Sequence, residues 1–337
     1  MKTVVVGLSG GVDSSVACAL LKEQGYHVIG LFMRNWDSTT NNDVLGNPDI
    51  DNDLCPQEQD FQDAQLVADK LGIELHRVDF IKEYWDNVFT YFLDEYKKGR
   101  TPNPDILCNK YIKFDAFIEH AKRFNPDFIA MGHYAQITHI DGVHQMLRGI
   151  DDNKDQTYFL SQLTSDQLST ILFPVGGLTK QEVRDMAHKY DLATKDKKDS
   201  TGICFIGERD FNKFLNNYLP SKPGNMVTLD GEVIATHAGL MYYTIGQRKG
   251  LGIGGSQKFG NEPWFVVGKN LETNDLLVGQ GFHHETLYSD KCIVDDVNLI
   301  NMKKFDGTLK CTAKFRYRQK DNDVTIEFDG DELIVSY

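Results

Sequence analysis

A strand that runs directly into a glycine- and serine-rich turn constrains this chain most. The β-branched run Val4–Val6 is followed at once by Gly7–Ser15, with the sequence GLSGGVDSS, and then by apolar residues at helical spacing in Ala17–Leu21. This order predicts a buried strand, a tight loop and a helix N-terminus. Glycines let backbone amides approach an oxyanion, serine hydroxyls add donors, and the helix dipole favours negative charge. We therefore predict a phosphate-binding loop.

The length and composition predict a globular protein of two or three domains. The chain has 337 residues, of which 41% are hydrophobic and 25% charged, as in ordinary soluble domains. No apolar run approaches the roughly 18 residues of a membrane span, and Met1–Thr3 leave no room for a signal peptide before the first strand. We therefore expect a cytoplasmic protein with no membrane partner.

Further along, apolar strands alternate with helical patterns. The runs Tyr26–Met33, Leu75–Val78 and Phe128–Met131 are the strands, and the alternation predicts an α/β fold with a doubly wound parallel sheet. Ligands of such sheets bind beyond the carboxyl ends of the strands. The segment Asn35–Cys55 lacks periodicity and predicts a mobile loop near the phosphate-binding loop.

Short-range signals fix several smaller elements. Asp141 and Gly142 predict a two-residue hairpin, and Thr164 and Thr179 each begin a capping box. From Phe211 onward the pattern changes to short strands, which predict a small β-barrel or sandwich. We expect domains at 1–210, 211–278 and 279–337.

Two cysteine segments stand out among six cysteines that contain no C-x-x-C pair, a spacing that fits neither a disulfide scaffold nor a zinc site. Gly99–Lys110 carries two prolines and contains Cys108, which lies at or just before a predicted helix N-terminus and close in sequence to Lys110 and Lys113. That setting predicts a lowered thiol pKa and a nucleophile. Cys204 lies in Asp199–Gly207, where a buried core thiol is an equally good interpretation.

Two further polar positions and one charged strip are candidates. His133 follows a predicted strand at its carboxyl end, which favours ligand contact, whereas Lys154–Gln156 could be an ordinary surface turn. The net charge of -13 argues against nucleic-acid binding. Seven basic residues between Lys303 and Lys320 nevertheless form a local basic strip, which could equally be a solvated face.

The motifs resemble a known family. Ser9–Ser14 resembles the pyrophosphatase loop of the ATP-pyrophosphatase superfamily. Gly99–Asn109, Asp199–Gly207, Tyr243–Gly254 and Phe315–Gln319 are similar to segments of bacterial tRNA-specific 2-thiouridylases. The resemblance implies an adenine nucleotide α-hydrolase-like fold. It also implies ATP-dependent 2-thiolation of the wobble uridine of tRNA, with adenylylation of uridine O2, sulfur transfer from a cysteine persulfide, and release of pyrophosphate and AMP.

The resemblance also implies roles for individual residues. Catalysis would belong to Cys108 as nucleophile, Cys204 as persulfide carrier and Asp105 as general acid/base. Nucleotide contacts would come from Gly7, Leu8, Ser9, Gly10, Gly11, Val12, Asp13, Ser14, Met33 and Gly132. Contacts to tRNA or the target base would come from Asn103, Pro104, Asp105, His133, Lys154, Asp155, Gln156, Tyr317 and Arg318.

The implied cofactor is ATP with Mg²⁺, whose ligands the sequence does not identify, and no other metal is expected. The implied partners are the tRNA anticodon loop and a persulfide donor, such as a cysteine desulfurase or sulfur-relay protein. Family members usually continue with further strands past the equivalent of Val335, so we expect the β-barrel-like tRNA-binding domain at 279–337 to be incomplete.

Three alternatives stay open at this point. Cys108 could release the sulfur by forming a transient disulfide with Cys204, or attack C2 of the uridine itself. The chain could be an amide-forming ATP pyrophosphatase that uses no thiol. It could also be a nucleotide-sensing module without turnover, or carry the basic strip as a protein-interaction surface.

Overall fold

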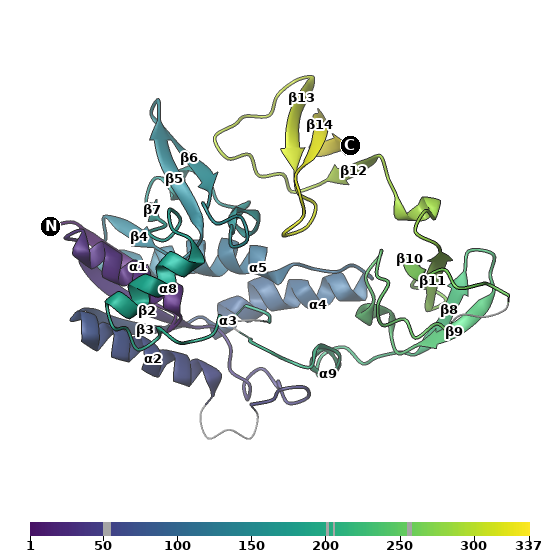
Figure 1. Cartoon of the computed structure of the whole chain (residues 1–337), viewed down its shortest axis with the longest axis horizontal. Helices are drawn as coiled ribbons and strands as arrows, with labels where there is room; N and C mark the ends of the chain where they lie inside the picture. The colour runs from purple at the N-terminus through teal and green to yellow at the C-terminus, as the bar shows by residue number, and fades with distance from the viewer. Residues whose placement is uncertain (50–54, 200–201, 205, 255–257) are drawn as a thin grey trace.

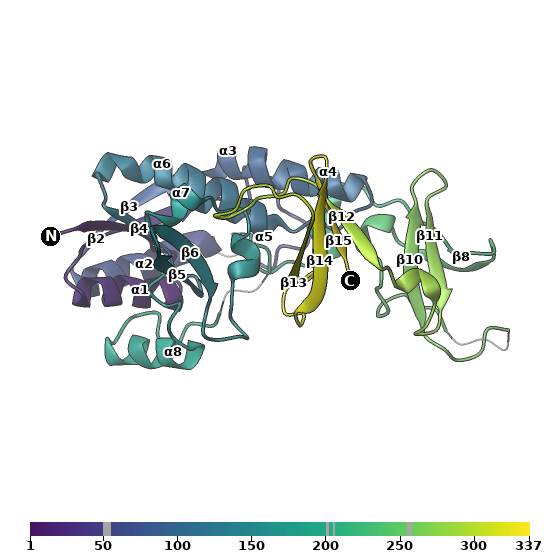
Figure 2. The ribbon, with the colours of Figure 1, turned by 90° about the horizontal axis from the view of Figure 1, so that it is seen from above.

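The computed structural model describes residues 1–49, 55–199, 202–204, 206–254 and 258–337. An α/β part built from the N-terminal residues occupies one end of the molecule, and the strands β8 to β11 occupy the other (Figure 1). The C-terminal strands β12 to β15 lie between these two parts in both views (Figures 1 and 2). No helix among the described residues combines the length and apolar character that a membrane span needs.

The predicted parallel sheet is confirmed. Its strand order is β3-β2-β1-β4-β7, and every neighbouring pair is parallel. The strands are β1 Thr3–Gly7, β2 His27–Arg34, β3 Glu74–Asp79, β4 Phe128–Ala130 and β7 Ile171–Leu172. Because β1 lies near the middle of the sheet, its valines are fully buried, and the turn that follows it opens at the carboxyl edge.

Helices cover both faces of this sheet, as expected of a doubly wound fold. One face packs against α1 Val12–Glu23, α2 Pro56–Leu71 and α8 Lys180–Lys189. The other face packs against an aromatic-rich series of helical segments. These are α3 Ile81–Tyr84, the π-helix η1 Trp85–Phe89, α4 Thr90–Lys97, α5 Pro104–Leu107, the π-helix η2 Cys108–Ala116, α6 Phe117–Ala121 and the 3₁₀ turn η3 Lys122–Phe124.

The hairpin and the two capping boxes predicted from the sequence are confirmed. Strands β5 Ala135–Ile140 and β6 Val143–Arg148 form the hairpin, with Asp141 and Gly142 both at positive φ, as a two-residue turn requires. After the 3₁₀ turn η4 Thr157–Leu160, both capping boxes are present: Thr164 begins α7 Ser165–Leu168 and Thr179 begins α8.

The second half contains the expected short strands, arranged in two separate four-stranded sheets. The first has the order β10-β11-β8-β9 and follows α9 Phe211–Asn216. Its strands are β8 Gly224–Thr228, β9 Val233–His237, β10 Trp264–Asn270 and β11 Asp275–Gln280, with the turn η5 at Leu240–Tyr242. The second is antiparallel, with the order β12-β15-β14-β13. Its strands are β12 Lys291–Val294, β13 Thr308–Ala313, β14 Asn322–Asp329 and β15 Glu332–Ser336, preceded by the turn η6 at Glu285–Leu287.

The prediction of a mobile loop at Asn35–Cys55 is wrong for residues 35–49, while residues 50–54 lie outside the described part. Trp36 is buried against Tyr84 and Phe89 and donates a hydrogen bond from Nε1 to Asp43 at 3.0 Å. Asp43 in turn pairs with Arg209 at 2.8 Å, and both side chains are almost fully buried, with exposures of 0% and 4%. A buried ion pair therefore fixes this loop to the segment that enters α9.

Removing one member of this pair should destabilise the fold. In Asp43→Ala the guanidinium of Arg209 loses its buried carboxylate partner, which costs about 3–5 kcal/mol. We expect the free energy of unfolding in urea to fall by that amount. Lys82→Ala is the control because the Lys82–Asp86 pair is exposed, so its loss should leave the free energy of unfolding nearly unchanged. Equal losses in the two variants would contradict this role of the buried pair.

Candidate active site

The phosphate-binding loop lies between the end of β1 at Gly7 and the start of α1 at Val12. Gly10 has a φ of +74°, and a Cβ there would lie 2.1 Å from the carbonyl oxygen of Asp60, so only glycine fits. The N-cap of α1, Gly11, provides no side-chain cap for the helix. The hydroxyl of Ser14 donates to the carbonyl of Gly11 and lies 3.1 Å from the hydroxyl of Ser9. The loop therefore presents hydroxyls and uncapped helix amides, which suit an anion.

Two more residues that were predicted to contact the nucleotide, Met33 and Gly132, lie beside this loop. Gly132 follows β4, and a Cβ on it would lie 2.8 Å from the amide nitrogen of Ser14. The end of β4 therefore touches the first turn of α1, which leaves no room for a side chain. Met33 is buried in β2, and its Cε lies 3.5 Å from the position that a Cβ on Gly7 would take. The structure thus brings Gly7, Met33 and Gly132 together at the carboxyl edge.

Ion pairs link the loop to the Cys204 segment. The Nζ of Lys180 donates to the carboxylate of Asp13 at 2.7 and 2.9 Å and lies 2.9 Å from Asp199. The hydroxyl of Tyr134 also donates to Asp13, at 2.8 Å. Asp199 accepts from Lys154 and Arg184 as well, each at 2.7 Å.

The charges around Asp199 change its pKa. Partial burial raises the pKa of this carboxyl, but the hydrogen bonds from Lys154 and Lys180 outweigh it and lower the pKa to about 2. Lys180, Arg184 and Tyr134 were not predicted from the sequence. The capping box at Thr179 places Lys180 at the start of a helix, but no local signal shows which carboxylates it meets.

The two candidate cysteines lie side by side, although 96 positions separate them. The Sγ of Cys108 donates to the Sγ of Cys204 at a distance of 3.6 Å. Tyr84 donates from its hydroxyl to the carbonyl oxygen of Cys204 at 2.9 Å, which holds the Cys204 segment against α3. Both thiols are free. A disulfide needs the sulfurs about 2.05 Å apart, so a small displacement would close the pair. Ser200, Thr201 and Phe205 of this segment lie outside the described residues.

The predicted environment of Cys108 is wrong in two respects. Helical structure begins at Pro104, where the Asn103 side chain accepts a hydrogen bond from the amide of Asp105. Cys108 therefore lies a full turn inside the helix and is fully buried. Burial and the hydrogen bond to Cys204 raise the pKa of Cys108 well above its usual value. The same hydrogen bond, together with the charge of Lys113, lowers the pKa of Cys204 despite burial. Of the two thiols, Cys204 is therefore the one that ionises more readily.

Asp105 lies beside this pair. Burial raises the pKa of its carboxyl, although the charge of Lys113 and a backbone hydrogen bond from Cys204 oppose the shift. Its Oδ1 is buried and has no hydrogen-bond partner among the described residues. Such a carboxyl holds its proton more readily than a free aspartate does, which suits proton transfer.

The residues predicted to contact tRNA fall into different environments. His133 is buried between the rings of Phe114 and Phe173, and burial together with Lys113 lowers its pKa well below the usual value. Asp155 is buried, and its carboxylate accepts from the amide of Gly149 and the hydroxyl of Thr157.

The neighbouring polar residues also make structural contacts. Gln156 accepts from the amide of Tyr134 through its side chain, and Lys154 pairs with Asp199. The segment 154–156 is therefore part of the scaffold around the phosphate-binding loop rather than a plain solvated turn.

Tyr317 comes from the loop between β13 and β14 and reaches back to the α/β part. Its ring centroid lies 4.5 Å from that of Phe159, and the exposed Arg318 guanidinium lies 5.3 Å from the Tyr317 ring. Arg148 and Asp321 join the same two parts through a bidentate ion pair at 2.7 and 2.9 Å. Tyr317 and Arg318, both predicted to contact tRNA, therefore lie where the C-terminal sheet meets the α/β part.

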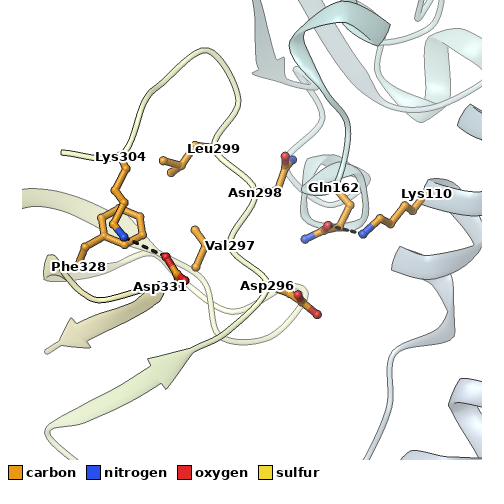
Figure 3. A pocket seen from close by; sticks show the side chains of 9 residues that line it. All are labelled: Lys110, Gln162, Asp296, Val297, Asn298, Leu299, Lys304, Phe328 and Asp331. Carbon is orange, nitrogen blue, oxygen red and sulfur yellow. Dashed lines mark hydrogen bonds and ion pairs between the residues drawn. The ribbon is translucent and has the colours of Figure 1, made fainter.

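A polar pocket of about 510 Å³ also lies at this junction (Figure 3). Lys110 and Gln162 line it from the catalytic part, joined by a hydrogen bond of 3.1 Å, and Lys304, Phe328 and Asp331 line it from the C-terminal segment. None of the site residues predicted from the sequence lines this pocket.

The carboxylates nearest the loop are paired with cationic side chains. Within the described part of the chain, no group of three His, Cys, Asp or Glu residues is placed to hold a metal ion. Asp13 and Asp199 are each neutralised by lysine or arginine. Magnesium as a counter-ion of ATP stays an expectation from the sequence, and no step proposed below depends on it.

The parallel sheet with a phosphate-binding loop at its carboxyl edge is the architecture of a PP-loop enzyme. A family model described as "tRNA methyl transferase HUP domain" matches residues 2–208, and one described as "tRNA methyl transferase PRC-barrel domain" matches residues 212–280. The tRNA-specific 2-thiouridylase of Acholeplasma laidlawii is 61% identical over 98% of this chain and 87% of its own length. That of Staphylococcus carnosus is 59% identical over 99% and 87%. The chain belongs to the tRNA-specific 2-thiouridylase family and is a tRNA sulfurtransferase.

Family membership decides against two of the alternatives that the sequence left open. The interpretations as an amide-forming synthetase and as a sensing module without turnover find no support, since the relatives are sulfurtransferases acting on tRNA. The finer steps of the reaction are treated below as a proposal.

A side chain at position 132 should disturb the phosphate-binding loop. In Gly132→Ala the new methyl group meets backbone atoms of Asp13 and Ser14 within 3 Å, which cannot move aside as a side chain could. We expect a loss of about 1–3 kcal/mol in stability and at least a tenfold slower tRNA thiolation. Gly177→Ala is the matched control, because the nearest atom to its new methyl group would be the side-chain oxygen of Gln136, 3.9 Å away. Full activity of Gly132→Ala would contradict the tight contact.

The Asp199 cluster predicts a pH-dependent contribution to stability. The folded pKa of about 2 lies below the unfolded value of about 3.9, so ionised Asp199 stabilises the fold above pH 4. This contribution is lost as the pH falls through about 2. We expect the difference in urea midpoint between wild type and Asp199→Asn to be constant above pH 4 and to shrink towards pH 2.

Asp196→Asn is the control for this measurement because its carboxylate is largely exposed. It should change the midpoint little at any pH. A difference for Asp199→Asn that does not vary with pH would rule out the proposed linkage.

Proposed function

We propose that the chain activates the wobble uridine of tRNA with ATP and then replaces O2 by sulfur. Gly7–Ser14, with Met33 and Gly132, binds ATP so that its phosphates lie against the start of α1. Uridine O2 attacks the α-phosphate, pyrophosphate leaves, and an adenylated uridine results. The glycine geometry of the loop, the uncapped helix amides and the approach of Gly132 to Ser14 support this assignment.

Sulfur then enters through Cys204. The Cys204 thiolate attacks the outer sulfur of a donor persulfide, the donor's S–S bond breaks, and the donor leaves as a thiolate. The resulting Cys204 persulfide supplies its outer sulfur to C2 of the uridine, and AMP leaves. The lowered pKa of Cys204 supports this role, because the thiolate is the nucleophile. The donor is a persulfide-carrying protein such as a cysteine desulfurase or sulfur-relay protein.

Cys108 completes the transfer. In one route its sulfur attacks the Sγ of Cys204, the persulfide S–S bond breaks, and a Cys108–Cys204 disulfide forms, which a cellular dithiol reduces in a two-electron step. In the other route Cys108 first attacks C2 and AMP leaves. The outer sulfur of the Cys204 persulfide then displaces the Cys108 thiolate from C2, and the persulfide S–S bond breaks as in the first route. The 3.6 Å separation of the two sulfurs favours the first route, and this separation is the single observation that carries the proposal.

Asp105 acts as the general acid or base at the target base. Its raised pKa and its unpartnered, buried Oδ1 beside the thiol pair support this role. A neutral carboxyl can protonate Cys204 or the leaving oxygen and later return the proton. Asn103 and Pro104 fix the start of this helix and thereby the position of Asp105.

The tRNA would contact the junction of the three proposed domains, 1–210, 211–278 and 279–337. The base must leave the anticodon stack to reach the carboxyl edge of the sheet. Tyr317 and Arg318 suit stacking and phosphate contact at this junction. The buried His133 and the scaffold residues Lys154, Asp155 and Gln156 would act from below the base by fixing the walls of the site.

Substitution of either cysteine tests this proposal directly. With unmodified tRNA, ATP, magnesium and a persulfide donor, Cys108→Ser and Cys204→Ser should give no 2-thiouridine above background, because each sulfur is needed once per turnover. Mass analysis of nucleosides from the digested tRNA measures the exchange of oxygen for sulfur. Pyrophosphate release should persist in both variants, since adenylylation precedes sulfur transfer.

Cys292→Ser is the matched control, because this partly buried thiol lies in β12 away from the pair. It should retain wild-type thiolation. Wild-type thiolation by Cys108→Ser or Cys204→Ser would contradict the proposed chemistry.

A further inference from the structure

The helix that carries Cys108 has an unusual register. Residues Cys108–Ala116 form a π-helix, in which each carbonyl accepts from the amide five residues on. In an α-helix, residue i+5 would lie about 140° around the axis from residue i. In the π-helix the two are near neighbours on one face. The register therefore places Lys113 over the same face as Cys108.

Lys113 reaches both sulfurs of the pair. Its ammonium hydrogen-bonds to Cys204 and interacts electrostatically with Cys108 and Asp105. Burial by itself would lower the pKa of Lys113, but these negative partners raise it, so Lys113 is a cation at neutral pH. Lys110, three residues earlier, turns instead to Gln162 at the junction pocket (Figure 3).

The charged and polar groups around Cys204 shift its ionisation in opposite directions. Lys113 favours the thiolate, Asp105 disfavours it, and Cys108 donates a hydrogen bond to it. Tyr84 binds the Cys204 carbonyl rather than its sulfur, and His133 faces Lys113 in its neutral form. Lys113 is thus the cation that favours ionisation of Cys204.

We propose that Lys113 is a positioning residue that assigns the roles of the two cysteines. Its ammonium holds the negative charge of the pair on Cys204, so that Cys204 rather than Cys108 accepts sulfur from the donor, and Cys108 stays protonated until the sulfur has been delivered. The roles of Cys204 as sulfur carrier and of Cys108 as the thiol that releases the sulfur rest on the proposed function. The difference in ionisation between the two thiols does not depend on it.

The test measures thiol reactivity without ATP or tRNA. The full-length protein is treated with iodoacetamide between pH 5 and 10, and mass spectrometry of peptides gives the rate at each cysteine. In wild type, Cys204 should react faster than Cys108 at pH 7. In Lys113→Met, which keeps the length of the side chain but removes the charge, Cys204 should react roughly tenfold more slowly at pH 7, with its midpoint shifted to higher pH.

Two further variants separate charge from packing. Lys113→Arg keeps the charge and should restore most of the Cys204 rate, and Lys110→Met should leave it unchanged. The proposal is overturned if Lys113→Met reacts like wild type, or if Lys113→Arg is as slow as Lys113→Met. If the wild-type protein shows the expected alkylation pattern but does not thiolate tRNA, the proposed function is refuted and the role of Lys113 at the two thiols still stands.

Discussion

One lysine between two carboxylates connects the phosphate-binding loop with the Cys204 segment. Lys180 contacts both Asp13 in the first turn of α1 and Asp199, five residues before Cys204. The loop and the Cys204 segment lie far apart in the sequence. These partly buried contacts therefore set where the Cys204 segment begins relative to the loop. A change in the charge at Asp13 would be felt at Asp199 through the same ammonium group.

The other end of the Cys204 segment is fixed by different means. Tyr84 binds the Cys204 carbonyl, and the buried Asp43–Arg209 pair fixes the chain shortly after it. Between these anchors the segment makes a tight turn, in which Ile203 bridges to Gly207. The proposed sulfur transfer needs a carrier that can contact both the sulfur donor and Cys108. A short segment held at its two ends meets this need better than a thiol inside a helix, such as Cys108.

The sequence predicted those features that local residues decide. Val4–Val6 and the glycines after them specify a strand and loop, Asp141 and Gly142 specify a hairpin, and Thr179 specifies a helix start. The roles of Lys180 and Arg184 could not be predicted in this way, because their partner Asp199 is brought near by the tertiary fold. Trp36 and Asp43 were missed for the same reason. Their segment has no periodicity, yet it is buried by aromatic residues that come from η1 and α9.

The error at Cys108 shows why proximity in sequence is a poor guide to charge at a thiol. Two lysines close in sequence to Cys108, together with a predicted helix N-terminus, predict a cationic setting for the thiol. Pro104 begins the helix one turn earlier, so the helix dipole acts on Asp105 rather than on the thiol. Lys110 turns to Gln162, and only Lys113 reaches the sulfurs, because the π-helical register rotates it onto their face. The nine residues Cys108–Ala116 do not show from their sequence whether they form a π-helix or an α-helix. The charge that decides which thiol ionises therefore depends on a backbone register that only the folded structure defines.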